Sequence, residues 1–234
     1  MARRRFEDKV VLVTGGTSGL GLATCALFLT EGAKLFVTDL LKRDVLSTLS
    51  GSNKSPNIHF QTCDVSSPSS CASAVSACIA KLSRIDVLFH NGARLADLGT
   101  VVDQDIATFD AVVRTNLSGL FYLSRAVIPP MKAQATGGSI VVTASTAGLF
   151  GDYGLCSYSA AKAGSVNLVR TMALDHARDG IRLNAVCPGY MVTPMTEGFR
   201  SEKHVHEALL ESIPLNRGAQ PEEVGSAVLF FGVG

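Results

Sequence analysis

Short apolar runs, rich in β-branched residues, recur along the chain and are separated by longer segments of mixed character. Most of these runs are almost continuously apolar, which is typical of strands that are buried on both faces of a sheet. The strands expected from this pattern are Val10–Thr14, Lys34–Thr38, Ile58–Thr62, Val87–His90, Ser139–Thr143 and Arg182–Val186.

The segments between these runs have the spacing of amphipathic helices. The expected helices are Leu20–Thr30, Cys71–Leu82, Ile106–Lys132, Tyr158–Arg178 and Glu222–Phe230. Strands and helices that alternate at these lengths predict an α/β fold, a doubly wound parallel sheet flanked by helices in three layers. A chain of 234 residues fits one such domain, residues 1–234, better than two.

The longest interruption of the pattern runs from Pro188 to Pro214, after the sixth expected strand. Ligands of such sheets bind near the carboxyl ends of the strands, where long loops often cover them. We therefore expect residues 190–214 to form a substrate lid, with a surface insertion as the alternative.

Composition and charge exclude several classes of function. Apolar residues make up 47% of the chain and the net charge is +1, so there is no basic field for nucleic acid or an anionic membrane. No segment is long and apolar enough to span a membrane. The six cysteines form no CxxC pair, so the sequence predicts reduced thiols in a cytoplasmic protein and no metal site.

A glycine-rich turn follows the first expected strand directly and opens the first helix. Small residues there let the backbone approach a pyrophosphate, and the helix N-terminus offers free N–H groups to the phosphates. This placement after a strand and before a helix predicts a Rossmann-like dinucleotide site. The expected cofactor-binding residues of the turn are Gly15, Thr17, Ser18, Gly19, Leu20 and Gly21.

Asp39 ends the second expected strand, where an acidic side chain can accept hydrogen bonds from the adenosine ribose. A carboxylate there repels the 2′-phosphate of NADP, so the sequence favours NAD. Lys42 and Arg43 leave NADP open, because either cation would receive that phosphate if it folded back.

Tyr158 and Lys162 are four residues apart and therefore share one face of an expected helix. A free tyrosine has a pKa of about 10, which makes it a poor base at neutral pH. A nearby ammonium group and an oxidised nicotinamide would both stabilise the phenolate and lower that pKa. Ser145 follows the fifth expected strand, at the sheet edge where a ligand belongs, and completes a plausible set of catalytic residues.

Taken together, these residues resemble the short-chain dehydrogenases/reductases, in their single-domain, NAD(P)-dependent branch. The resemblance extends over nearly the whole chain. Its further markers are Cys63-Asp64-Val65, His90-Asn91-Gly92-Ala93, Thr115-Asn116-Leu117, and Pro188-Gly189 followed by Thr193.

The resemblance implies a role for each marker. Asp64 and Val65 would meet the adenine, Asn91 would lie near its ribose, and Gly92, Pro188 and Gly189 belong to the cofactor site. Thr193 would contact the carboxamide region, and Lys162 the nicotinamide ribose. Asn116 would hold a water-linked proton path with Lys162. Ser145 would polarise the substrate oxygen and Tyr158 would act as acid and base.

The chain departs from the family pattern in two places. The family motif Asn-Asn-Ala-Gly is replaced by His90-Asn91-Gly92-Ala93, which puts a methyl group near the cofactor and a histidine that we expect to be structural. Relatives usually also continue into a seventh strand. Here the chain ends at Gly234, so the C-terminus is expected to be shortened and the sixth strand to form an open edge.

The sequence therefore predicts an oxidoreductase that interconverts a small, largely apolar secondary alcohol and a ketone. The alternative is a catalytically silent NAD(P)-binding sensor or scaffold, which the altered motif and the short C-terminus favour. By resemblance, the protein forms a homodimer or homotetramer. The residues expected to line the substrate pocket are Leu95, Leu149, Phe150, Tyr153, Cys156, Tyr190, Met191 and Phe199.

Overall fold

The protein is described by a computed structural model that covers residues 4–41, 48–49 and 57–233. In these residues one parallel sheet has the strand order β3-β2-β1-β4-β5-β6. The strands are β1 (Val10–Thr14), β2 (Lys34–Asp39), β3 (Ile58–Thr62), β4 (Val87–His90), β5 (Gly138–Thr143) and β6 (Ile181–Val186). Because the order reverses between β1 and β4, a crevice opens at the carboxyl ends of these two strands.

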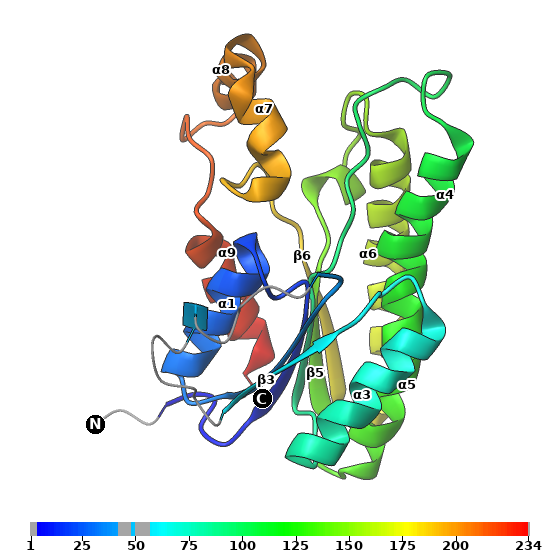
Figure 1. Ribbon diagram of the computed structural model, residues 1–234, viewed down its shortest axis with the longest axis vertical. Helices are drawn as coiled ribbons and strands as arrows, with labels where there is room; N and C mark the ends of the chain where they lie inside the picture. Colours follow the sequence, from blue (N-terminus) through cyan, green and yellow to red (C-terminus); the bar gives the residue numbers. More distant parts are fainter. Residues whose placement is uncertain (1–3, 42–47, 50–56, 234) are drawn as a thin grey trace.

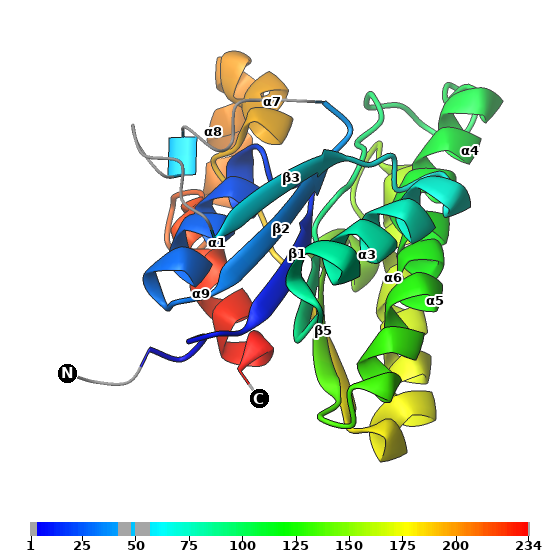
Figure 2. The same cartoon turned by 60° about the horizontal axis from the view of Figure 1, so that its bottom comes forward.

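Helices cover both faces of the sheet, which confirms the three-layer α/β fold (Figures 1 and 2). On one face lie α1 (Gly19–Thr30) and α9 (Pro221–Gly232). On the other lie α3 (Pro68–Leu82), α5 (Gly119–Ala133) and α6 (Cys156–His176), with α4 (Ile106–Val113) beside α6. The short helices α7 (Glu197–Ser201) and α8 (Lys203–Glu211) stand beyond the end of the sheet.

Side-chain alternation along each strand divides the core into two layers. In β1, Val11 and Val13 pack with Phe28 of α1, whereas Leu12 packs on the opposite face with Leu123 of α5. Both layers are closed to solvent, since all five side chains are fully buried. The nearly continuous apolar runs therefore reflect strands that are covered on both sides.

Two expected elements differ in detail from the structure. The segment Ile106–Lys132 was expected to be one regular helix, but a π-helical turn, Arg114–Ser118, joins α4 to α5. The stretch from Pro188 to Pro214 was expected to be a loop, but it contains α7 and α8. The sequence also breaks the pattern at Gly51–Pro56, which predicts a loop, and this segment lies outside the described residues.

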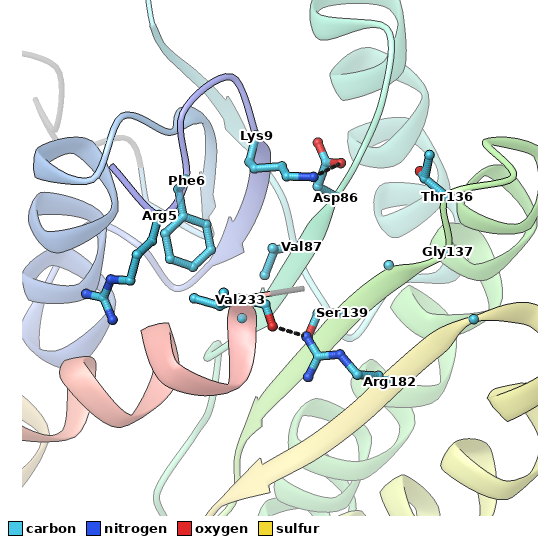
Figure 3. Close-up of a pocket in the computed structure, with 13 residues that line it drawn as sticks. Arg5, Phe6, Lys9, Asp86, Val87, Thr136, Gly137, Ser139, Arg182 and Val233 are labelled. Carbon is cyan, nitrogen blue, oxygen red and sulfur yellow. Dashed lines mark hydrogen bonds and ion pairs between the residues drawn. The ribbon is translucent and has the colours of Figure 1, made fainter. Parts of the chain in front are cut away.

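At the amino ends of the strands, opposite the crevice, the buried carboxylate of Asp86 joins two segments, and Figure 3 shows its pairing with Lys9. The Oδ2 atom of Asp86 accepts hydrogen bonds from the backbone N–H of Val10 and from Nε of Arg84, both at 2.9 Å. A second bond from Arg84, at 2.7 Å, completes a bidentate pair, and Nζ of Lys9 lies 3.7 Å away. Asp86 therefore links the start of β1 to the segment that enters β4.

Replacing Asp86 with alanine should destabilise the fold by on the order of 2 kcal/mol, because the buried N–H of Val10 would lose its acceptor. Urea unfolding measures this change. Asp8→Asn is the control, since the exposed carboxylate of Asp8 pairs with Lys34 at the surface and asparagine tolerates the left-handed backbone at this position (φ 61°), so the change should cost less than about 1 kcal/mol. Equal effects of the two variants would contradict the role given to Asp86.

Candidate active site

A cavity of about 1040 Å³ lies at the carboxyl ends of the strands. Every strand contributes to it through the residues at or just after its end. These include Gly15 after β1, Asp39 in β2, Cys63 after β3, Asn91 after β4, Thr143 in β5 and Pro188 after β6. The 190–214 segment also lines the cavity, with Tyr190, Met191, Phe199, Val205 and Leu209. The cavity is thus large enough for a dinucleotide and a small substrate together.

The glycine-rich turn has the geometry that a pyrophosphate requires. Gly15 has a φ of 62°, and a Cβ atom on Gly21 would overlap the carbonyl oxygen of Gly15, so α1 approaches the turn closely. Ser18 caps α1 without a side-chain capping bond, and the first turn carries no acidic residue. The N–H groups of that turn therefore remain available to phosphate oxygens. The residues of the turn that line the cavity are Gly15, Ser18, Gly19 and Leu20. Thr17 instead binds Asp39, and Gly21 packs against the carbonyl of Gly15.

Asp39 is held in place by the same turn. Its Oδ2 atom accepts hydrogen bonds from the backbone N–H of Thr17 at 3.1 Å and from the Thr17 hydroxyl at 2.6 Å. Its Oδ1 atom accepts one from the N–H of Leu40 at 2.8 Å. The carboxylate thus faces the cavity at a fixed position beside the glycine turn, and the fit to an adenosine ribose is good. Lys42 and Arg43 lie outside the described residues.

The remaining predicted cofactor residues also line the cavity: Asp64, Val65, Asn91, Gly92, Pro188, Gly189 and Thr193. The Asp64 carboxylate accepts bonds from the backbone and hydroxyl of Ser66, at 2.9 and 2.7 Å. Thr193 lies against Gly19, where an added Cβ would approach it to 3.4 Å. The base of the lid segment therefore meets the glycine turn.

The side chain of Asn91 acts as a brace within the protein. Its Nδ2 donates to the carbonyl of Gly15 at 3.0 Å, and its Oδ1 accepts from the Thr143 hydroxyl at 3.0 Å. We expected Asn91 near the adenosine ribose. The structure places it in the cavity wall, but its amide already joins the ends of β1 and β5.

His90 is a structural residue, as expected, but it is only half satisfied. Its Nδ1 lies 3.2 Å from the Thr14 hydroxyl, while its Nε2 is buried and has no partner among the described residues. The Thr14 hydroxyl already accepts the N–H groups of Asn91 and Gly92, so its own proton goes to Nδ1. Burial lowers the pKa of His90 to about 3, and the charge of Lys162 adds to this effect, so the ring is neutral.

The three predicted catalytic side chains meet in the cavity. Lys162 is 3% exposed, and its Nζ donates to the carbonyl oxygen of Thr143 at 2.7 Å and lies 5.5 Å from the centroid of the Tyr158 ring. Tyr158 hydrogen-bonds to Ser145, whose Oγ also accepts the N–H of Ala147 at 3.1 Å. The end of β5 and the first turns of α6 therefore bring all three groups together.

The electrostatics of this group differ from the sequence-based expectation. We expected the Lys162 ammonium to lower the pKa of Tyr158. Instead, burial raises the pKa of Tyr158, a hydrogen bond with Ser145 opposes the rise, and the charge of Asp152 adds to it. Burial also lowers the pKa of Lys162 to about 8, with a smaller opposing effect from Cys187. The protein alone therefore favours the neutral phenol.

Asn116 lies in the π-helical turn and does not line the cavity. Its side chain exchanges two hydrogen bonds of 2.8 Å with the backbone of Arg94, and its carbonyl accepts the Ser165 hydroxyl at 3.0 Å. The predicted link to Lys162 through water is not tested by these contacts. Asn116 does hold Arg94 at the cavity wall. A π-helical turn is common at functional sites, but no periodicity of apolar residues marks this one.

The substrate end of the cavity was only partly predicted. Leu95, Tyr153, Tyr190, Met191 and Phe199 line it as expected. Leu149, Phe150 and Cys156 do not; the first two side chains are largely exposed, and the thiol of Cys156 donates to Gln104 at 3.1 Å. Sequence analysis missed Arg94, Leu98, Asp152, Leu155, Val205 and Leu209. No periodic pattern marks these residues, because most of them lie in loops.

Comparison with known proteins agrees with this geometry. Residues 9–204 match the family model described as short chain dehydrogenase. The chain is 37% identical to a 3-oxoacyl-(acyl-carrier-protein) reductase of Thermotoga maritima, over 97% of this chain and 91% of that protein. It is also 37% identical to a meso-2,3-butanediol dehydrogenase of Serratia marcescens, with coverages of 97% and 88%. The chain belongs to the short-chain dehydrogenase family.

Solved structures lead to the same conclusion. The crystal structure of levodione reductase superposes with a TM-score of 0.90 at 32% identity, over 97% of this chain and 91% of the other. As a short-chain dehydrogenase, the protein is a nicotinamide-dependent oxidoreductase that interconverts a secondary alcohol and a ketone. No observation favours the alternative of a catalytically silent binding protein.

A metal site and a membrane-spanning helix are both absent from the described residues. No group of three or more His, Cys, Asp or Glu side chains is arranged to hold a metal ion. None of the helices found there is both long enough and apolar enough to cross a membrane.

Lys162→Met should stabilise the cofactor-free protein below pH 8, where the buried ammonium is costly. The lowered pKa of Lys162 corresponds to a cost of about 3 kcal/mol in the free energy of unfolding, which the variant would recover. Loss of the hydrogen bond to Thr143 would offset about 1 kcal/mol of this gain. The folded protein releases this proton near pH 8 and the unfolded chain near pH 10.5. The gain in stability should therefore decrease as the pH rises from 8 to 10.5. Urea unfolding from pH 7 to 10.5 measures it.

The exposed Lys81 of α3 supplies the matched control, because Lys81→Met removes a solvated ammonium and should show no such trend. If Lys162→Met lowered stability equally at every pH, the buried charge would not carry the cost assigned to it.

Proposed function

We propose that this short-chain dehydrogenase uses NAD and that Tyr158, Ser145 and Lys162 carry out its chemistry. The observation that supports this most strongly is the placement of a half-buried Tyr158 beside both partners, in the same cavity as Asp39 and the glycine turn. Each part alone is common, but together they serve one reaction, hydride transfer coupled to proton transfer.

In the direction of reduction, Ser145 donates a hydrogen bond to the substrate carbonyl and the Tyr158 hydroxyl gives its proton to the oxygen. The raised pKa of Tyr158 keeps this phenol protonated and ready to donate. When bound, the nicotinamide supplies or accepts the hydride. In the direction of oxidation, the Lys162 ammonium stabilises the phenolate that takes the proton from the substrate hydroxyl.

The preference for NAD follows from Asp39. Three hydrogen bonds from Thr17 and Leu40 fix its carboxylate. Moving the carboxylate away from a 2′-phosphate would break these bonds, so its charge repels NADP. A ribose with both hydroxyls free offers it donors instead.

We further propose a single catalytic domain in which residues 190–214 act as the substrate lid. The lid segment lines the cavity through both its base and α7 and α8. The similarity to a protein named for meso-2,3-butanediol supports a small alcohol or ketone as substrate, and many lining side chains are apolar. Closure of such a segment would exclude water from the reacting atoms.

We propose a cytoplasmic homodimer or homotetramer. All six cysteines are free and four of them are buried, which suits a reducing compartment. Large apolar side chains are exposed on α4, α5 and α6, among them Ile106, Phe121 and Leu174. Pairing of these helices between two subunits would cover such a surface.

Tyr158→Phe should lower kcat by about 10²- to 10⁴-fold, because the proton donor is removed while the ring still fills its place. Affinity for NAD⁺, measured by titration calorimetry, should stay within about threefold, a range set by the small free energy of one neutral contact. Tyr122→Phe, outside the cavity, is the control. Normal turnover by Tyr158→Phe would exclude Tyr158 as the acid and base.

Asp39→Ala should reduce the ratio of NAD⁺ to NADP⁺ affinity by about tenfold or more, since both ribose binding and repulsion of the 2′-phosphate are lost. Asp39→Asn separates these effects, because it removes the charge and retains a hydrogen-bond acceptor. Asp97→Asn, an exposed charge change outside the lining, is the reference. An unchanged ratio in Asp39→Ala would rule out Asp39 as the residue that reads the ribose.

A further inference from the structure

Five charged side chains line the cavity: Asp39, Asp64, Arg94, Asp152 and Lys162. Asp39, Asp64 and Lys162 are engaged by hydrogen bonds from or to neighbouring residues. The side chains of Arg94 and Asp152 have no hydrogen bond or ion pair in the part of the chain that the structure describes. Asp152 is thus an exposed carboxylate that lines the cavity without a protein donor among the described residues, and a ligand can supply one.

The position of Asp152 is well defined by backbone contacts. It begins a turn that leads into α6, in which the N–H of Leu155 donates to the Asp152 carbonyl at 3.4 Å. The next residues are fixed from the other side, because Gly99 donates to the carbonyl of Gly154 at 3.0 Å and forms a parallel bridge with Leu155. The carboxylate is therefore presented from a fixed turn, six residues before Tyr158.

Asp152 lies at the catalytic end of the cavity rather than at the adenine end. Burial is the main reason that the pKa of Tyr158 is raised, and the negative charge of Asp152 adds to the effect. Leu155, Tyr190 and Met191 line the same cavity, and Asp152 stands in the turn that enters α6 six residues before Tyr158. A group bound between Asp152 and Tyr158 would be part of the substrate, close to its reacting carbon.

The charged side chains of the cavity favour a neutral hydrogen-bond donor as the substrate group that binds Asp152. An ammonium group on the substrate would be attracted by Asp152 but would also meet the cations of Lys162 and Arg94. A carboxylate on the substrate would be repelled by Asp152. A hydroxyl avoids both repulsions and still donates a hydrogen bond to a charged acceptor.

Building on the proposed function, we infer that the substrate is a hydroxylated alcohol or ketone, and that Asp152 binds its second hydroxyl beside the reacting carbon. Diols and hydroxyketones should therefore be preferred over the corresponding simple alcohols and ketones. Asp152 is then a specificity-determining residue, separate from the residues that transfer the proton.

The test compares butane-2,3-diol with butan-2-ol, which share a carbon skeleton. The wild-type enzyme should show a kcat/KM about 10- to 100-fold higher for the diol, the range expected for one hydrogen bond to a charged group. In Asp152→Ala this ratio should fall towards 1, and in Asp152→Asn it should be intermediate. Asp110→Asn, an exposed carboxylate of α4 outside the cavity lining, should keep the wild-type ratio.

A binding experiment distinguishes failure of this inference from failure of the proposed function. Both alcohols are titrated into NAD⁺-loaded Tyr158→Phe, with and without Asp152→Ala, and their Kd values are compared without need of turnover. Tighter diol binding that depends on Asp152 supports the inference even if the wild-type enzyme turns over neither alcohol, an outcome that would count against the proposed function. A diol preference that is absent, or unchanged by Asp152→Ala, would overturn the inference alone.

Discussion

The site depends on a polar junction at the point where the strand order reverses. The Thr14 hydroxyl at the end of β1 accepts the N–H groups of Asn91 and Gly92 after β4 and donates to His90. Asn91 then joins Gly15 to Thr143 at the end of β5. Three neighbouring strands are thereby fixed at their carboxyl ends. The glycine turn starts at this junction with Gly15, and the Thr143 carbonyl that accepts the Lys162 ammonium also belongs to it.

The junction also explains how a buried ammonium is tolerated. Lys162 needs an acceptor inside the protein, and the Thr143 carbonyl provides one because Asn91 holds the Thr143 side chain on the other side. The neutral state of His90 keeps a second positive charge away from the same region. The energetic cost of Lys162 is thus concentrated where the oxidation state of the cofactor and the charge on Tyr158 change during the reaction.

Much of this arrangement follows from the sequence, because its causes are local. A short, almost continuous apolar run favours a strand buried between two helical layers, and β1 and β4 were placed to the residue on this pattern. The edge strand β3, which alternates apolar and polar residues, was also placed to the residue. Tyr158 and Lys162 meet because a helix brings residues four apart onto one face.

Other features depend on contacts between distant segments, and the sequence holds no periodic sign of them. The π-helical turn at Asn116 exists because its side chain binds the backbone of Arg94, far away in the chain. The amide of Asn91 braces two strands for a similar reason. The exposure of Leu149 and Phe150 was missed because loop side chains follow tertiary packing rather than periodicity.

The same division separates chemistry from selectivity. Ser145, Tyr158 and Lys162 are fixed by the end of a strand and the interior of a helix, so their geometry changes little when loops vary. Asp152 lies on a turn whose backbone is held by Gly99 and Gly154, independently of its own side chain. A substitution at position 152 therefore leaves these backbone contacts of the turn in place. Such a position can change substrate preference while the proton-transfer residues stay in place.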